Sequence, residues 1–307
     1  MRRNLLKDTN SQKLSGSIFA AAAYIIWGAL PLYWMLLNNV QPFVVVSFRV
    51  LFSMAFLSVI LFFSAERKEI RLVFTNKKLL FKFIASSVTI FINWSMFIFG
   101  ISMGWYLDVS FGYFMTPLFQ VILGMLFLKE KMDAVTLVSS LLAFAAIIYL
   151  MVAQGIFPWF SIVLSISFAI YGVQKKTMHT DAFAGLYLET LFMSPVSIGI
   201  LIFCSQFAAI PFGQEFLTTF LLVAAGVVTT VPLILYNLAA KRISLISLGF
   251  YQYLSPTGTF LIGVLVNHDP VKPYQLVSFS LIWIALIIFT AASIVKARKE
   301  RQLLLET

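Results

Sequence analysis

Residues 109–117 read VSFGYFMTP, and residues 248–256, which lie 139 positions later, read LGFYQYLSP. Both stretches carry aromatic residues at matching positions, and both end on a proline, Pro117 and Pro256. Residues 24–28 (YIIWG) match residues 168–172 (FAIYG) at the nearby offset of 144. Chance similarity between short apolar segments is the alternative to a repeat. The shared offsets predict two similar halves, at residues 16–153 and 154–295.

The repeated stretches lie within long apolar runs. Hydrophobic residues make up 61% of the 307 residues and charged residues only 11%, far from the balance of a soluble domain. Because roughly 20 apolar residues cross the ~30 Å hydrocarbon core, the runs predict an all-α membrane protein, and they do not alternate as barrel strands would. The ten expected spans are residues 16–37, 43–64, 79–100, 105–128, 133–153, 157–173, 183–204, 217–238, 244–266 and 273–295.

Positive charge predicts how these spans are oriented. Of the 22 Lys and Arg residues, 20 fall on one side, in the N-terminal segment 1–15, in the C-terminal tail 296–307 or in the connectors around 65–82, 129–132, 174–182 and 239–243. The exceptions are Arg49, inside a span, and Lys272, on the other side. The positive-inside rule then places both termini in the cytoplasm. Each half has five spans, an odd number, so the second half must be inverted in the membrane, as in many secondary transporters.

Several function classes are excluded by what the sequence lacks. The net charge of +10 does not indicate a nucleic-acid partner, because the basic residues sit in short clusters between apolar runs. The single cysteine, Cys204, rules out a disulfide framework. There is no phosphate-binding loop, no metal-ligand spacing and no nucleophile–base pair, so we expect no cofactor, no metal and no enzyme.

Three charged residues within the predicted spans are candidates for a functional role. Arg49 could extend outward to the membrane surface or reach into a water-filled cavity. Asp108 could favour the N-terminus of its helix electrostatically, or it could act on substrate or protons. Glu189 is the other candidate for proton coupling, and its depth makes a direct pair with Arg49 doubtful.

Other residues suit a ligand pocket or a hinge. Asn93, beside Trp94, could tie helices together or contact substrate. Aromatic residues with a few polar groups suit an organic ligand, with ordinary packing as the alternative. The cavity candidates of this kind are Trp27, Tyr113, Tyr251 and Gln252. Pro117 and Pro256 occupy equivalent positions of the repeat, so they are hinge candidates, with a static kink as the simpler view.

Six segments, taken in order, resemble the RarD-type transporters of the EamA branch of the drug/metabolite transporter superfamily. They are residues 22–28, 93–98, 110–118, 188–190, 226–233 and 248–256. The resemblance implies two inverted five-helix EamA repeats in the inner membrane of a bacterium. It also implies a central cavity lined mainly by helices one, three, four, six, eight and nine, which adds Thr230 to the candidates.

The sequence departs from this family at a few positions. Asp108 stands where Glu is common, which keeps the charge, and Asp269 where Glu is usual. Thr116 stands where the family commonly has Asn, so no substrate contact is carried over to that position.

The leading hypothesis is a secondary exporter of small organic molecules, either metabolites or drugs such as chloramphenicol. It would work by alternating access, and its partners would be the substrate, the lipid bilayer and a coupling proton or counter-substrate. A homodimer is left open. The alternative is a non-transporting membrane sensor or scaffold.

Overall fold

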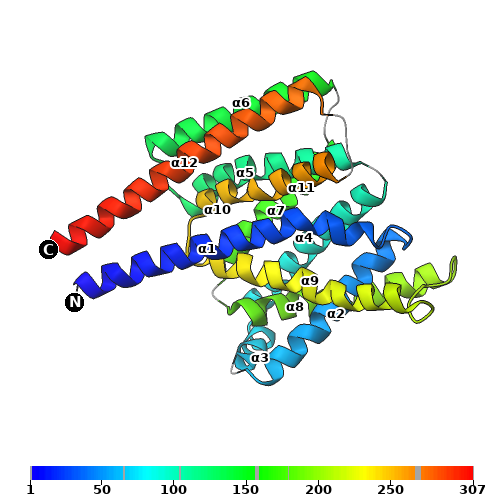
Figure 1. The fold of residues 1–307 in the computed structure, drawn as a ribbon. Helices are drawn as coiled ribbons and strands as arrows, with labels where there is room; N and C mark the ends of the chain where they lie inside the picture. Colours follow the sequence, from blue (N-terminus) through cyan, green and yellow to red (C-terminus); the bar gives the residue numbers. More distant parts are fainter. Residues whose placement is uncertain are drawn as a thin grey trace.

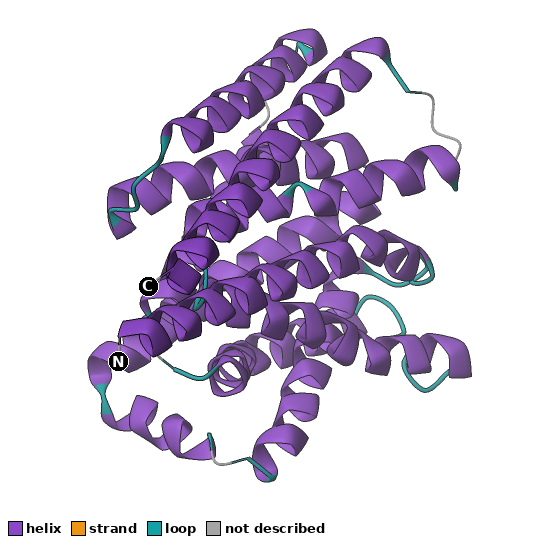
Figure 2. Ribbon diagram, turned by 60° about the vertical axis from the view of Figure 1, so that its left-hand side comes forward, coloured by secondary structure: helices purple, strands orange, loops and turns teal. Residues whose placement is uncertain are grey.

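The chain folds into helices joined by turns and loops in the computed structural model. The backbone is described for residues 2–64, 66–103, 105–155, 159–178, 180–266 and 271–306. The side chains of these residues are described too, apart from residues 2–11, 67, 106–108, 154, 263, 293 and 296–306. Within these limits there are helices and no strands (Figure 2), so the predicted all-α class is confirmed.

Twelve helices follow one another along the described chain. The first six are α1 (Arg2–Met35), α2 (Pro42–Phe62), α3 (Arg67–Thr75), α4 (Lys77–Ser102), α5 (Tyr106–Leu128) and α6 (Ala134–Gln154). The remaining six are α7 (Trp159–Thr177), α8 (Ala182–Ser205), α9 (Phe216–Ala240), α10 (Leu245–Gln252), α11 (Leu254–Leu265) and α12 (Pro273–Glu306).

Eight of these helices, counted over the described residues, are long and apolar enough to cross a membrane. Each predicted span overlaps one helix, except that the span at 244–266 is divided into α10 and α11, both shorter than a membrane is thick. Neither of these two helices is among the eight, nor is α7, which carries Ser161, Ser165 and Ser167. Helix α3 lies in a connector where no helix was predicted.

Local sequence explains where several helices begin and end. Pro42 occupies the first turn of α2, where its missing N–H is not needed. The Asp133 side chain accepts a hydrogen bond from the Thr136 N–H at 2.9 Å and caps α6. The Asp181 side chain caps α8 in the same way. Gly155 ends α6 with a φ of 68°, a conformation that glycine adopts without steric penalty.

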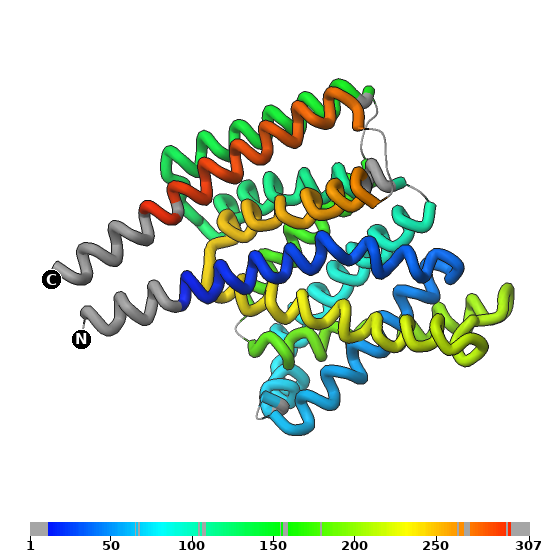
Figure 3. Tube along the Cα trace, in the orientation of Figure 1, coloured from blue at the N-terminus to red at the C-terminus, as the bar shows by residue number. Residues whose placement is uncertain are grey.

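The helices form one bundle with an outlying pair (Figure 1). Helices α6 and α12 pack against each other along one side of the bundle, while α2, α8 and α9 pack together on the opposite side. The first coloured part of α1 and the last coloured part of α12 lie at the same end of the molecule (Figure 3).

The helix pairs repeat between the two halves. Helix α5 packs against α7, and its counterpart pair is α11 against α1. Helix α1 packs against α9 as α7 packs against α4, and α2 packs against α9 as α8 packs against α4. When each helix is replaced by its counterpart from the other half, these helix contacts are therefore reproduced.

The tightest helix contact for which a glycine is required joins α2 and α9. A Cβ atom added at Gly226 would lie 2.4 Å from the backbone carbon of Phe52 and 2.6 Å from its oxygen. The Ser53 hydroxyl donates a hydrogen bond to the Gly226 carbonyl oxygen at 3.1 Å, which holds the two helices at this distance. A small residue at such a crossing lets two membrane helices approach closely.

We expect Gly226→Ala to destabilise the protein, because the new methyl group must push α2 and α9 apart. Overpacking of this kind costs about 1–3 kcal/mol. The matched control is Gly199→Ala in α8, where an added Cβ would meet nothing within 4 Å. Thermal melting of the purified protein would measure both effects. Equal melting temperatures for the two variants would contradict the prediction.

Candidate functional site

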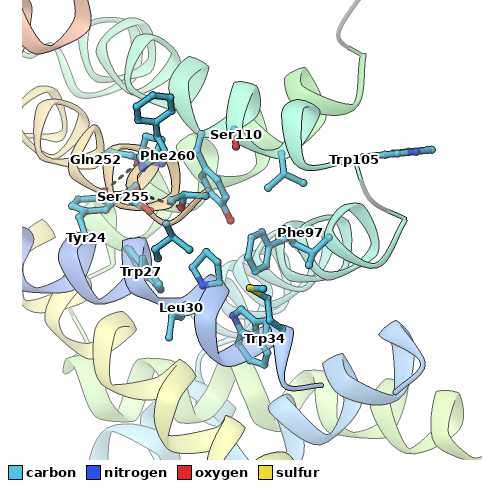
Figure 4. A pocket seen from close by; sticks show the side chains of 18 of the residues that line it. Tyr24, Trp27, Leu30, Trp34, Phe97, Trp105, Ser110, Gln252, Ser255 and Phe260 are labelled. Carbon is cyan, nitrogen blue, oxygen red and sulfur yellow. Dashed lines mark hydrogen bonds between the residues drawn. The ribbon is translucent and has the colours of Figure 1, made fainter. Parts of the chain in front are cut away.

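A cavity of about 730 Å³ lies within the bundle. Its walls come from α1, α2, α4, α5, α7, α11 and α12, with Gln252 at the end of α10. Figure 4 shows side chains of these helices around the hollow, with Trp27 and Trp34 of α1 on one side and Ser110 of α5 on another. Most of the lining is aromatic or aliphatic, with a few polar groups, which suits an organic ligand.

One end of the cavity is closed by aromatic side chains. The Tyr24 hydroxyl donates a hydrogen bond to Gln252 Oε1 at 3.2 Å (Figure 4), joining α1 to α10. The Trp27 ring lies 5.6 Å from the Phe168 ring and 5.8 Å from the Tyr236 ring, measured between centroids. These contacts link α1, α7 and α9.

The other end of the cavity reaches the connectors that lie opposite the two termini. Trp105, just before α5, belongs to the lining, as do Lys272 and Gln275 around the start of α12. The cavity therefore extends from the middle of the bundle toward this end.

Arg49 of α2 lines the cavity although its side chain is only 4% exposed. Its guanidinium carbon lies 4.5 Å from the Trp94 ring centroid and 5.1 Å from that of Trp34, so the charge sits between two indole faces. Nε and Nη1 are buried and have no hydrogen-bond partner among the described residues.

Asn93 both lines the cavity and ties two helices together. Its Nδ2 donates hydrogen bonds to the Leu164 carbonyl oxygen at 2.9 Å and to Ser167 Oγ at 3.1 Å. These hydrogen bonds fix helix α4 to α7. Buried amides often join helices in this way in membrane bundles.

Glu189 belongs to a separate buried cluster. Its carboxylate lies 3.1 Å from Lys175 Nζ and accepts hydrogen bonds from the Tyr171 hydroxyl, at 3.0 Å, and from Ser86. The side chain of Glu189 is fully buried and that of Lys175 is 5% exposed. The partner of Glu189 is therefore Lys175 and not Arg49. This cluster joins α4, α7 and α8.

Glu130 holds the two halves together at the end where the termini lie. Its carboxylate accepts hydrogen bonds from the Leu245 N–H at 2.8 Å and the Ile246 N–H at 3.0 Å, the first residues of α10. Lys129 before it adopts a φ of 53°, a strained conformation for a residue with a side chain. Lys176 Nζ lies 3.8 Å from the Glu130 carboxylate.

Lys241 forms a further contact between connectors at this end of the bundle. Lys241 Nζ donates a hydrogen bond to the Thr180 carbonyl oxygen, which fixes the connector after α9 to the start of α8. Burial lowers the pKa of the Lys241 ammonium, while the neighbouring Asp181 carboxylate acts in the opposite direction.

The structure brings most of the predicted residues to the cavity. Its lining includes the cavity candidates Trp27, Asn93, Trp94, Tyr113 and Gln252, together with Arg49 and Pro256. The side chain of Asp108 lies outside the described residues. Its neighbours Val109 and Ser110 line the cavity.

Four predicted residues lie elsewhere. Thr230 is buried in α9, which packs against α1 and α2 and contributes no residue to the lining. Tyr251 is half-buried and packs on the core cluster around Tyr24 and Tyr236. Glu189 lies in the cluster with Lys175, and Pro117 lies within the continuous helix α5.

Some lining residues were not predicted, although the sequence carries a signal for them. Tyr24, Pro31 and Trp34 line the cavity together with the predicted Trp27. They are spaced three or four residues apart, so they share one face of α1. Lys272 and Gln275 were missed because the tenth span was expected to lie outside the cavity.

The chain is similar to known proteins in sequence and in fold. The family model for the EamA-like transporter family matches residues 14–152. The uncharacterized transporter YojE of Bacillus subtilis (strain 168) is 37% identical over 93% of this chain and 96% of its own. Protein RarD of Salmonella typhi is 34% identical over 94% and 99%. A solved crystal structure with 14% identity has the same fold, with a TM-score of 0.67 over 93% of this chain and 98% of that one.

We expect Lys175→Met to destabilise the protein, because it leaves the Glu189 carboxylate buried without a cation. Removing one partner of a buried ion pair costs about 3–5 kcal/mol, whereas replacing both by apolar residues is often neutral. The double variant Lys175→Met/Glu189→Met should therefore melt closer to wild type than the single variant. Thermal melting in detergent measures this, and a single variant as stable as wild type would contradict it.

Proposed function

This chain belongs to the RarD-type transporters of the EamA branch of the drug/metabolite transporter superfamily, and from that membership we propose a secondary active exporter of small organic molecules. The cavity carries this proposal. Its volume of about 730 Å³ falls within the ~300–1,000 Å³ usual for small-ligand sites, and its lining combines aromatic walls with a few polar groups.

The proposed topology has ten membrane passes in two inverted five-helix repeats, at 16–153 and 154–295, with both termini in the cytoplasm. The repeated helix pairs support the repeat, and the distribution of Lys and Arg supports the orientation. Helix α7 and the joined helices α10 and α11 supply the two passes beyond the eight long apolar helices. In a bacterium this membrane is the plasma membrane.

In this topology the cavity extends toward the outer face and is closed toward the cytoplasm. The closing contacts are the Tyr24–Gln252 hydrogen bond and the binding of Glu130 to the start of α10. Alternating access requires these contacts to separate while the outer end closes. Pro117 and Pro256 remain the hinge candidates. A proton or a counter-substrate would supply the energy, with Asp108 and Glu189 as the carboxylates to test for proton coupling.

The direct test is transport by purified protein in proteoliposomes. We expect uptake of at least one compound, from a panel of amphenicols, amino acids and metabolites, that depends on an ion gradient or a counter-substrate. Trp27→Ala should lower that uptake by about tenfold, because it removes an aromatic wall of the cavity. The matched control is Trp159→Ala, since Trp159 is 56% exposed on α7 and lies outside the cavity.

The rival function, a sensor or scaffold that does not transport, predicts a different result. No compound would be transported, and Trp27→Ala cells would keep the phenotype of wild-type cells. That pair of outcomes would overturn the transporter proposal.

The orientation of the cavity is tested separately by cysteine labelling. In a Cys204→Ser background, Ser110→Cys places a thiol on the cavity wall. We expect a membrane-impermeant maleimide added outside intact cells to label it, because the cavity would reach the outer face. Ser247→Cys, near the start of α10, should be labelled only in inverted vesicles. The opposite labelling pattern would show that the proposed topology is reversed.

A further inference from the structure

Arg49 is a buried cation without an acidic partner among the described residues. The side chain is 4% exposed, and two of its nitrogens, Nε and Nη1, have no hydrogen-bond partner among the described residues. None of the described residues forms a salt bridge with Arg49. A cation placed in a membrane span without a partner is strongly unfavourable.

Lys175, the other buried cation among the described residues, has a charged partner. Lys175 is paired with Glu189 at 3.1 Å inside a cluster of hydroxyl groups. Arg49 has only the indole faces of Trp34 and Trp94, at 5.1 and 4.5 Å from its guanidinium carbon. Indole faces orient a guanidinium and attract its charge, but they cannot accept its in-plane N–H groups. Nε and Nη1 are buried behind the cavity wall without a partner, so a ligand reaches them only when the Arg49 side chain shifts toward the cavity that it already lines.

The charges around the cavity share one sign. The described lining contains two basic residues, Arg49 and Lys272, and no Asp or Glu. Polar groups such as Gln252 and Ser255 are few, and the remaining surface is mostly aromatic and aliphatic. A ligand that complements this surface carries one negative group and an apolar body.

We propose that the cavity binds organic monocarboxylates and that Arg49 is the residue that binds the carboxylate. The planar guanidinium offers two parallel N–H groups to the two carboxylate oxygens, a geometry that an ammonium does not provide. The aromatic walls take the apolar body. This inference rests on the proposed transport function and specifies its substrate class.

The test measures binding to the purified full-length protein in lipid nanodiscs by isothermal titration calorimetry. The probes are carboxylates from acetate to 3-phenylpropionate and 4-phenylbutyrate, each compared with its own primary amide. We expect at least one carboxylate to bind about ten- to a hundredfold more tightly than its amide, since the two differ chiefly in charge.

Variants assign that preference to one residue. Arg49→Gln should abolish the preference for carboxylate over amide, and Arg49→Lys should retain part of it. The matched control is Arg71→Gln, the same change at an exposed position of α3, which should leave the preference unchanged. Monodisperse elution and thermal melting establish that each variant is folded.

Several outcomes would overturn the proposal. Among the binding results these include equal binding of every carboxylate and its amide, failure of all carboxylates to bind, and a preference that survives Arg49→Gln. A preference that appears only in Asp108→Asn protein would also overturn it, because Asp108 would then be neutralising Arg49. Gradient-driven transport of neutral compounds alone would overturn the carboxylate site and leave the transporter proposal intact. Carboxylate binding without any transport would overturn the transporter proposal and leave the carboxylate site intact.

Discussion

Inside a membrane, the protein must supply the partner of every buried charge, because lipid supplies none. The ion pair between Lys175 and Glu189 meets this requirement at 3.1 Å, with hydroxyl groups from Ser86 and Tyr171 on the same carboxylate. Four side chains from α4, α7 and α8 are thereby held in one arrangement. Separating these helices would leave an unpaired charge in the membrane, which opposes their separation.

Charged side chains at the closed end have partners within the protein, whereas Arg49 at the cavity lacks partners for two of its nitrogens. At the end where the termini lie, the Glu130 carboxylate accepts the free N–H groups at the start of α10, and Lys241 binds the Thr180 carbonyl oxygen. At the cavity, two nitrogens of Arg49 have no partner in the described part of the chain. The contacts that close the cavity therefore form without a ligand, whereas Nε and Nη1 of Arg49 gain a partner only when a ligand binds.

The helical bundle was predictable from the sequence, but the neighbours of each helix were not. Apolar runs and capping residues such as Asp133 and Asp181 mark where helices lie and begin. Hydrophobic spacing shows that one face is buried, yet it does not distinguish a face packed on a helix from one lining a cavity. Arg49 and Trp94 were found because charge and indole are unusual in a span, whereas Thr230 in α9 was placed in the cavity only by analogy.

Three residues of the cavity lining each precede a proline by four positions. Proline has no N–H, so the carbonyl of the residue four positions earlier loses its helical donor. Pro31, Pro117 and Pro256 free the carbonyls of Trp27, Tyr113 and Gln252, and all three of these residues line the cavity. At Gln252 the helix ends, and α11 begins two residues later. Irregular backbone is tolerated at membrane depth only where protein or water can satisfy it. The repeat thus places a residue whose carbonyl is freed by proline in each half, Tyr113 on α5 and Gln252 on α10, and both residues line the cavity.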